Sequence, residues 1–196
     1  RVPVTVGRPG RYAVMDYGSS LARSLAGKTE PLAYSALVIR SSPDSALAFD
    51  TRKLRWAAAW TGSFLKFPTE RDGVAGFPEI AGPPSFTLPS SKDSEGHPGG
   101  PLPRARGRWL GHYVHGSQVV LSYELGGSAI LELPGYQGEF LTRKLRIGPG
   151  PAFELPHPGG PVPIPARTKP QHLQLVHPPA PLKATGDLSA LINGGP

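Results

Sequence analysis

The sequence predicts an all-β protein, an antiparallel β-sandwich-like domain followed by a long Pro/Gly-rich extended C-terminal arm. The main observation is residues 107–147, where short apolar stretches separated by glycine turns are typical of a four-stranded antiparallel meander. The second is that only residues 19–25 show even slight helical periodicity. The third is the abundance of proline and glycine, 25 of each in 196 residues. Many of the prolines follow residue 148, which excludes helices and central strands from that part.

The meander has clear internal boundaries. Apolar and polar residues alternate over 118–125, which predicts one buried and one exposed face. Gly126 and Gly127 predict a two-residue hairpin loop of type I′ or II′, because glycine adopts positive φ angles without a steric penalty. Glu124 and Glu132 are expected to face solvent. The expected strands are 107–115, 118–125, 128–133 and 138–147.

Further strands are expected upstream, at 34–40, 46–50, 54–60 and 64–67. Residues 68–106 combine many Pro, Gly and Ser residues with spaced apolar ones, which predicts a long ordered loop with one short strand at 85–88. Ser19 or Ser20 is placed to cap one helical turn over 19–25. The chain therefore divides into a lead-in (1–12), a β-sandwich-like domain (13–147) and the arm (148–196).

The chain is basic, with a formal net charge of +7 and a sequence pI near 9.9. The basic residues are dispersed apart from two clusters, Arg104 with Arg106 and Arg108, and Arg143 with Lys144 and Arg146. No DNA- or RNA-binding signature accompanies them. We therefore favour a solvated basic surface that docks an acidic protein partner over nucleic-acid binding.

The chain has no cysteine, which excludes disulfides, thiolate zinc sites and a c-type haem attachment motif. His112 and His115 lie three apart on an expected strand, so their side chains point to opposite faces and cannot easily share a metal ion. No metal site and no cofactor are expected within this chain. No apolar run approaches the roughly 20 residues of a transmembrane helix. The chain begins at Arg1 rather than Met, which indicates a removed leader or a piece of a longer polypeptide.

Two tryptophans and two aspartates are the candidate site residues. Trp56 and Trp60 lie four apart, so on a regular strand they share a face, and with Tyr113 they would form an aromatic platform for a sugar ring. Asp16 and Asp50 would bind the glycan, or act as acid or base in a glycan-active enzyme. Core packing is the alternative for the tryptophans, and bracing of turns is the alternative for the aspartates. No nucleophile elbow, Walker A motif or dinucleotide fingerprint is present, so no catalytic residue is nominated.

The arm carries apolar residues between its prolines and is too apolar for a plain spacer. The sequence therefore indicates an arm that lies across another surface, with residues 171–176 suited to add a strand to an exposed sheet edge. The residues expected to contact a protein partner are Phe153, Leu155, Val162, Ile164, Leu173, Leu175 and Val176.

Several segments in a fixed order carry a resemblance that spans about residues 12–147. They are MDYG at 15–18, YSALVIR at 34–40, FDT at 49–51 with LR at 54–55, AAWTGSFL at 58–65, GPLPR at 100–104, GHYVHG at 111–116 and VVLSY at 119–123. In these segments the chain resembles an uncharacterised bacterial domain family known mainly from large exported proteins of planctomycetes and verrucomicrobia.

Members of this family often share one polypeptide with β-propeller and c-type cytochrome modules, which implies an accessory β-domain of an exported redox or carbohydrate-active protein. The family has no established activity, so the resemblance implies no catalytic residue. We therefore expect a non-catalytic accessory or structural domain of an exported, cytochrome-associated assembly, periplasmic or extracellular, that docks through its arm. A carbohydrate-binding module and a glycan-active enzyme domain are the alternatives.

Overall fold

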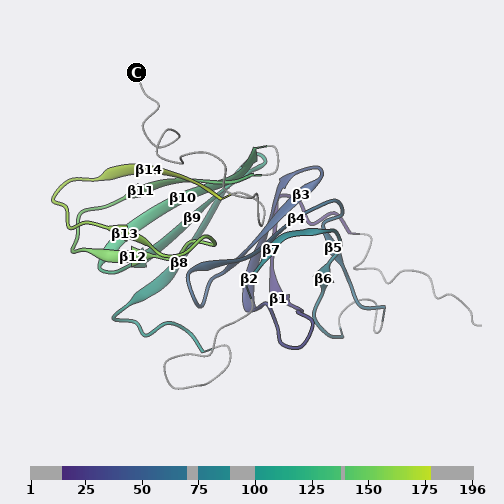
Figure 1. Ribbon diagram of the computed structural model, residues 1–196. Coiled ribbons are helices and arrows are strands. Elements are labelled where there is room, and N and C mark those ends of the chain that lie inside the picture. Colours follow the sequence, from purple (N-terminus) through teal and green to yellow (C-terminus); the bar gives the residue numbers. More distant parts are fainter. Residues whose placement is uncertain (1–14, 70–74, 89–99, 138–139, 178–196) are drawn as a thin grey trace, which may run out of the picture.

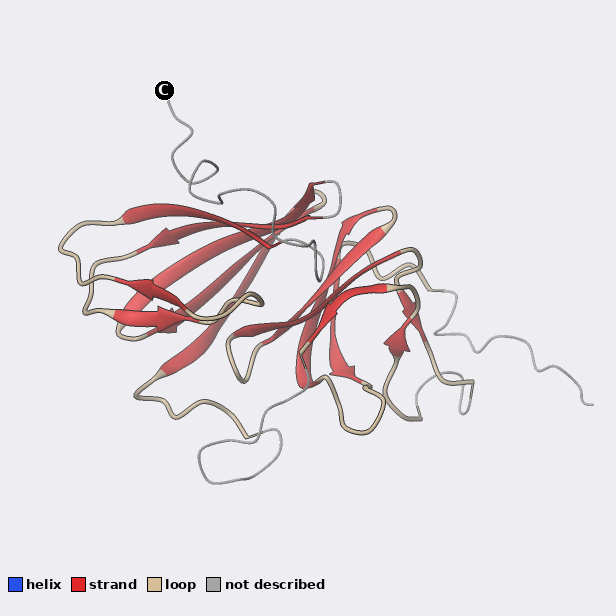
Figure 2. Cartoon of the chain, in the orientation of Figure 1, coloured by secondary structure: helices blue, strands red, loops and turns tan. Residues whose placement is uncertain are grey.

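The computed structural model describes residues 15–69, 75–88, 100–137 and 140–177. In this part of the chain every regular element is a β-strand and no helix occurs, which confirms the all-β prediction (Figure 2). The strands are β1 (Ser20–Leu25), β2 (Ala33–Ser42), β3 (Ser45–Asp50), β4 (Arg55–Thr61), β5 (Leu65–Lys66), β6 (Glu79–Ile80), β7 (Pro84–Thr87), β8 (Gly107–His115), β9 (Gln118–Leu125), β10 (Ser128–Gln137), β11 (Phe140–Ile147), β12 (Phe153–Leu155), β13 (Val162–Ile164) and β14 (Gln171–His177).

The first sheet has the order β1-β2-β3-β4-β7, and all its neighbouring strands are antiparallel. The prediction of a helical turn at residues 19–25 is wrong, because these residues form β1. Ser20 pairs with Ile39 and Leu25 with Ala33, so the backbone groups of β1 are bonded to β2 rather than to each other. Pairing with a neighbouring strand has overridden the weak local preference for a helical turn.

The second sheet has the order β14-β11-β10-β9-β8 (Figure 1). Its last four members are the predicted meander, which is confirmed. Gly126 and Gly127 have φ angles of 56° and 74°, as a type I′ turn requires, and Leu125 pairs with Ser128 across them. β10 is longer than expected and continues to Gln137.

The two sheets pack face to face around one large apolar cluster. The first sheet contributes Leu37, Ile39, Leu47, Phe49, Trp56 and Phe86, and the second contributes Val119, Leu121, Tyr123, Ile130, Leu145 and Ile147. Burial of each large side chain contributes roughly 1.5–3 kcal/mol, so this cluster is the main source of stability. The predicted sandwich-like arrangement follows from it.

A second apolar cluster lies on the other side of the first sheet. It contains Trp60 and a row of alanines, and Phe64, Leu65 and Ile80 pack against it from the segment that carries β5 and β6. Figure 1 shows β5 and β6 beside the first sheet, on the side away from the second sheet. The first sheet is therefore covered on both faces, whereas the outer face of the second sheet is exposed at Lys144 and Arg146.

The boundary predicted at residue 147 is wrong, because the sandwich continues through β12, β13 and β14. Leu155 and Ile164 are buried in the large cluster, where Phe153, Val162, Leu173 and Leu175 pack against it. β14 pairs with β11 along its whole length, so residues 171–176 extend a sheet of this same chain rather than one of a partner. Of the predicted partner-binding residues, Val176 remains exposed. The predicted lead-in (1–12) and residues 178–196 lie outside the described part of the chain.

Candidate functional site

An ion pair lies in the centre of the sandwich. The Nε of Arg143 donates to Oε1 of Glu132 at 2.6 Å, and Nη2 donates to Oε2 at 2.9 Å. Neither side chain is exposed to solvent. The prediction that Glu132 faces solvent and that Arg143 belongs to a solvated basic surface is therefore wrong.

The inward direction of both residues follows from strand alternation. On β11, Leu141, Arg143 and Leu145 share one face, so the arginine is in phase with buried leucines. On β10, Glu132 shares a face with the buried Ile130, but Leu131 and Leu133 lie on the other face, so the strand is apolar on both faces. The pattern of β11 therefore indicates that Arg143 points inward, whereas the pattern of β10 does not decide the direction of Glu132.

Two aromatic side chains complete the bonding of Glu132. Trp56, from the first sheet, donates from Nε1 to Oε1 at 2.8 Å. Tyr123, from β9, donates from its hydroxyl to Oε2 at 2.6 Å. Burial alone would raise the pKa of Glu132, but the charge of Arg143 and these hydrogen bonds lower it below its ordinary value. Each carboxylate oxygen thus accepts two bonds, and the carboxylate stays ionised.

The far side of Arg143 reaches the β12–β13 segment. Its Nη1 donates to the backbone oxygen of Pro156 at 2.7 Å and lies 3.4 Å from Nδ1 of His157. The ring of His157 stands perpendicular to that of His177, with centroids 5.5 Å apart. Burial lowers the pKa of His157 to about 4, with smaller contributions from Arg143 and His177, so its imidazole is neutral near pH 7.

His157 also lines a cleft of about 300 Å³. The other lining residues are Arg55, Trp56, Leu88, Arg106, Glu154, Pro156 and Pro161. Trp56, which lines this cleft, bonds Glu132. Because Glu132 has no exposed oxygen, its carboxylate cannot move a proton to or from a ligand in the cleft. The described residues also contain no group of three or more side chains able to hold a metal ion.

The two predicted platform tryptophans lie on opposite faces of the first sheet. β4 is bulged: Ala48 pairs with Ala58 and Phe49 pairs with Trp56, which leaves Ala57 as an extra residue. Trp56 therefore faces the second sheet, while Trp60 faces the β5–β6 side. They are 1% and 0% exposed, so neither ring can stack on a sugar, and the core-packing alternative is correct.

The two aspartates are engaged in turns of their own. The buried Asp50 accepts from the backbone N–H groups of Arg52 and Lys53 at 3.0 and 3.2 Å. Burial raises the pKa of Asp50, and these two bonds counter part of that rise. Asp16 is exposed and accepts from the N–H of Gly18 at 2.9 Å. Both contacts match the turn-bracing alternative.

Tyr113 is the one predicted site aromatic that is accessible, at 65% exposed. It lies on β8, the edge strand of the second sheet. Leu110 and Val114 on the same strand are 48% and 54% exposed. Three apolar side chains on one edge strand are thus available to another molecule.

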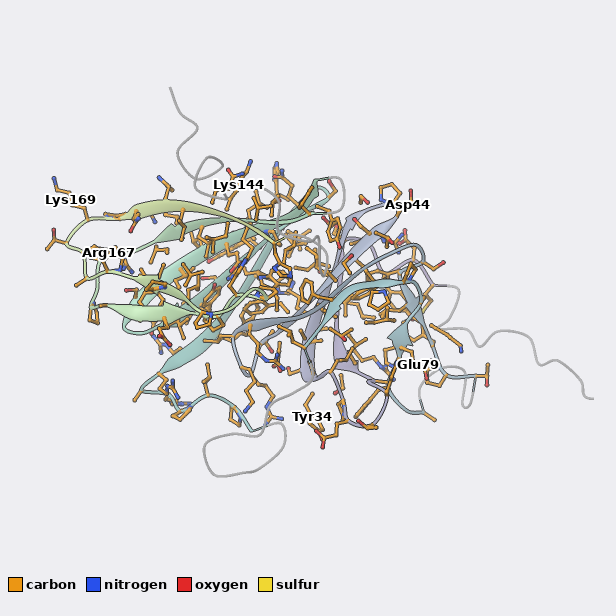
Figure 3. All side chains as sticks on the ribbon, in the orientation of Figure 1. Tyr34, Asp44, Glu79, Lys144, Arg167 and Lys169 are labelled. Atoms are coloured by element: carbon orange, nitrogen blue, oxygen red, sulfur yellow. The ribbon has the colours of Figure 1, made fainter. Side chains whose placement is uncertain are left out.

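The outer side of the second sheet is basic at the opposite edge. Figure 3 shows Lys144 on β11 and Lys169, just before β14, projecting away from the sheet. Arg108 on β8 is already paired, because its Nε and Nη2 donate to the two carboxylate oxygens of Glu124 at 2.8 and 2.9 Å.

The two sheets and the buried residues between them define an antiparallel β-sandwich with a hydrogen-bonded Arg143–Glu132 ion pair in its interior. A family model described as a domain of unknown function, DUF6797, matches residues 47–132. The match covers less than half of the 196-residue chain and runs from β3 into β10, so Trp56, Tyr123 and Glu132 lie inside it and Arg143 beyond it. It supports the resemblance to an uncharacterised domain family. No curated protein and no solved structure matches the chain. In the described part of the chain no helix is long and apolar enough to cross a membrane.

Proposed function

We propose that this chain is a non-catalytic accessory domain that docks onto a protein component of an exported assembly, in the periplasm or outside the cell. The observation that carries the proposal is the exposure of three apolar side chains along the edge strand β8, those of Leu110, Tyr113 and Val114. Exposed apolar side chains gathered on one element are typical of protein interaction sites. The groups best suited to chemistry, Glu132 and Arg143, are instead buried and bonded to each other.

The docking surface proposed here differs from the one that the sequence suggested. Leu155 and Ile164 of the arm are used in the chain's own core, so they cannot anchor a partner at the same time. The edge strand β8 takes their place. The proposal that the partner is a β-propeller or c-type cytochrome module rests on the family resemblance alone.

Glycan binding has less support, because Tyr113 is the one accessible side chain among the three aromatics predicted to form the platform. A single exposed ring gives one stacking contact, whereas Trp56 and Trp60 were expected to supply the rest of the platform. A glycan-array measurement with the purified chain separates the two functions, and we expect no binding.

The proposal is tested by the size of the native particle. The tagged chain is isolated from its native host under mild conditions, and its mass is measured by native mass spectrometry. We expect a particle heavier than the 20.7 kDa chain that contains a second polypeptide in a fixed ratio. A chain that is monomeric in every cell fraction would overturn the proposal.

A further inference from the structure

We infer that β8 binds an extended, acidic segment of the partner polypeptide, which adds to the second sheet as a further strand. This inference rests on the proposed docking function and names its site and the chemistry of its partner. It is carried by the backbone of β8, by the side chains beside that backbone, and by the charge around it.

The backbone of β8 has one open side. Over Gly107–His115 it pairs with β9, and the strand order ends at β8, so none of the described strands pairs with its other side. Along an antiparallel ladder the hydrogen bonds to one neighbour use alternate residues, and the backbone groups of the residues between them face outward. A nine-residue edge strand therefore offers several N–H and C=O groups to an incoming strand.

The other sheet edges carry features that discourage strand addition. β7 has four residues and includes Pro84, which has no N–H to donate. β1 is six residues long, carries Arg23 and has a shift in its pairing register. β14 itself contains no Lys, Asp, Glu or Pro, but Lys169 and Pro170 directly precede it, and Val176 is its one exposed large apolar side chain, against three on β8. Residues 109–115 of β8 contain no Lys, Asp, Glu or Pro, so this edge lacks the usual protective residues. Its irregularity is confined to the register shift at Leu110 and the positive φ angle of the following Gly111, before Tyr113 and Val114.

The side chains of β8 provide apolar contacts on both faces of an added strand. Tyr113 pairs with Val120 and Val114 pairs with Val119, so these successive residues point to opposite faces. Both are more than half exposed, at 65% and 54%. Alternate side chains of an added strand would thus pack beside Tyr113 on one face and beside Val114 on the other.

The charge around β8 indicates an acidic occupant. Arg104 and Arg106 are exposed and directly precede the strand. β8 carries no acidic residue, and Arg108 is already bonded to Glu124. The whole chain has a net charge of +7. A second copy of the chain would bring the same arginines to the interface, so like-charge repulsion favours an acidic segment of another protein.

The test uses the full chain in its native host, with photoreactive p-benzoylphenylalanine in place of Tyr113. After irradiation, the adducts are mapped to peptides by mass spectrometry. We expect one short segment of another polypeptide, with acidic side chains among its residues. The matched control places the same probe at Phe77, which is exposed and lies between β5 and β6, and we expect no adduct with that segment.

Three variants of the probe-carrying chain test the mode of binding. Val114→Lys adds a protective charge to the open edge, and the pair Arg104→Glu with Arg106→Glu reverses the local charge. Each is expected to lower the adduct yield about tenfold or more. Lys169→Glu, a single charge reversal away from β8, is expected to leave the yield unchanged. Urea unfolding confirms that each variant is folded.

Adducts with another segment of this chain or with a second copy, adducts scattered over several proteins, or no adduct at all would each overturn strand addition. The particle mass separates this failure from that of the docking proposal. A heavy particle without a Tyr113 adduct leaves docking in place and removes β8 as its site, whereas a monomeric chain removes both.

Discussion

Arg143 and Glu132 form a diagonal pair across β10 and β11 rather than a directly opposed one. Glu132 lies opposite Leu145, and Arg143 lies opposite Pro134, yet the guanidinium Nε is 2.6 Å from Oε1 of the carboxylate. Trp56 from the first sheet bonds the same oxygen, so one carboxylate links the two sheets. The other end of Arg143 bonds the backbone of Pro156 and joins the β12–β13 segment to the sandwich.

Loss of either charge is expected to destabilise the fold strongly. Glu132→Gln leaves the Arg143 guanidinium buried without its counter-charge, and Arg143→Leu leaves the carboxylate in the same state. We expect each to lower the free energy of unfolding by about 3–5 kcal/mol, measured by urea unfolding. The double variant Glu132→Leu with Arg143→Leu is expected to cost less than the sum of the two, because no lone charge remains buried.

The exposed pair on β8 and β9 supplies the control. Glu124→Gln removes a carboxylate that bonds Arg108 at 2.8 and 2.9 Å, but both of these side chains are exposed to water, at 39% and 60%. We expect its urea midpoint to stay close to that of the parent chain. Equal shifts for Glu124→Gln and Glu132→Gln would contradict the importance assigned to burial.

The meander could be predicted because its strands are bounded by local signals that act within a few residues. Glycine pairs such as Gly126 and Gly127 specify a tight turn wherever they stand in the fold. β1 could not be predicted in this way, since its structure depends on pairing with β2. The bulge at Ala57 is likewise set by packing on both faces of β4, and it moved Trp56 and Trp60 to opposite sides.

The candidate site was only partly predictable for the same reason. Exposure of Tyr113 follows from an edge position that becomes known only once the strand order is known. The direction of Arg143 could have been read from its alternation with leucines on β11. The bond from the first sheet to Glu132 could not, because its donor Trp56 lies 76 residues away in the sequence.

His157 is expected to make stability depend on pH between its ordinary and its native pKa. Burial is the main cause that lowers this pKa from 6.5 to about 4, and Arg143 and His177 lower it further while Glu132 opposes them. In that window the unfolded chain binds a proton that the folded chain does not, so stability falls as the pH drops. We expect a loss of roughly 1 kcal/mol, since solvent screens the partly exposed ring.

Urea unfolding from about pH 7.5 to about pH 5 measures this loss. His157→Gln is expected to reduce the dependence of the unfolding free energy on pH. A smaller dependence should remain from His177, because burial lowers the pKa of that side chain as well. His112→Gln, a matched change on the exposed strand β8, is expected to retain the full dependence. An unchanged slope in His157→Gln would exclude His157 as its source.

Gly126 is expected to tolerate a side chain poorly. A Cβ at this position would overlap Cβ and Cγ of Phe153, and the φ angle of 56° is unfavourable for other residues. Gly116 has a similar φ angle of 59°, but its Cβ would meet no atom within 4 Å. The two substitutions by alanine therefore differ mainly in the contact with Phe153.

We expect Gly116→Ala to cost about 1 kcal/mol from the backbone alone. Gly126→Ala should cost a further 1–3 kcal/mol, roughly the penalty of overpacking, because β12 must move away from the turn. Thermal unfolding of both variants measures the difference. If they are equally stable, the contact between the β9–β10 turn and Phe153 does not hold the C-terminal strands in place.

Truncation is expected to show that the proline-rich region belongs to the folded domain. A chain that ends at Ile147 loses β12, β13 and β14, so Leu155 and Ile164 leave the core and Arg143 loses the backbone oxygen of Pro156. Removal also exposes the edge of β11, and exposed edges promote aggregation. We expect this chain to be insoluble or to lack a cooperative unfolding transition.

A chain that ends at His177 keeps every described contact and is expected to unfold cooperatively. If the shorter chain instead unfolds with an unchanged midpoint, the strands after Ile147 are an appendage, as the sequence alone had suggested.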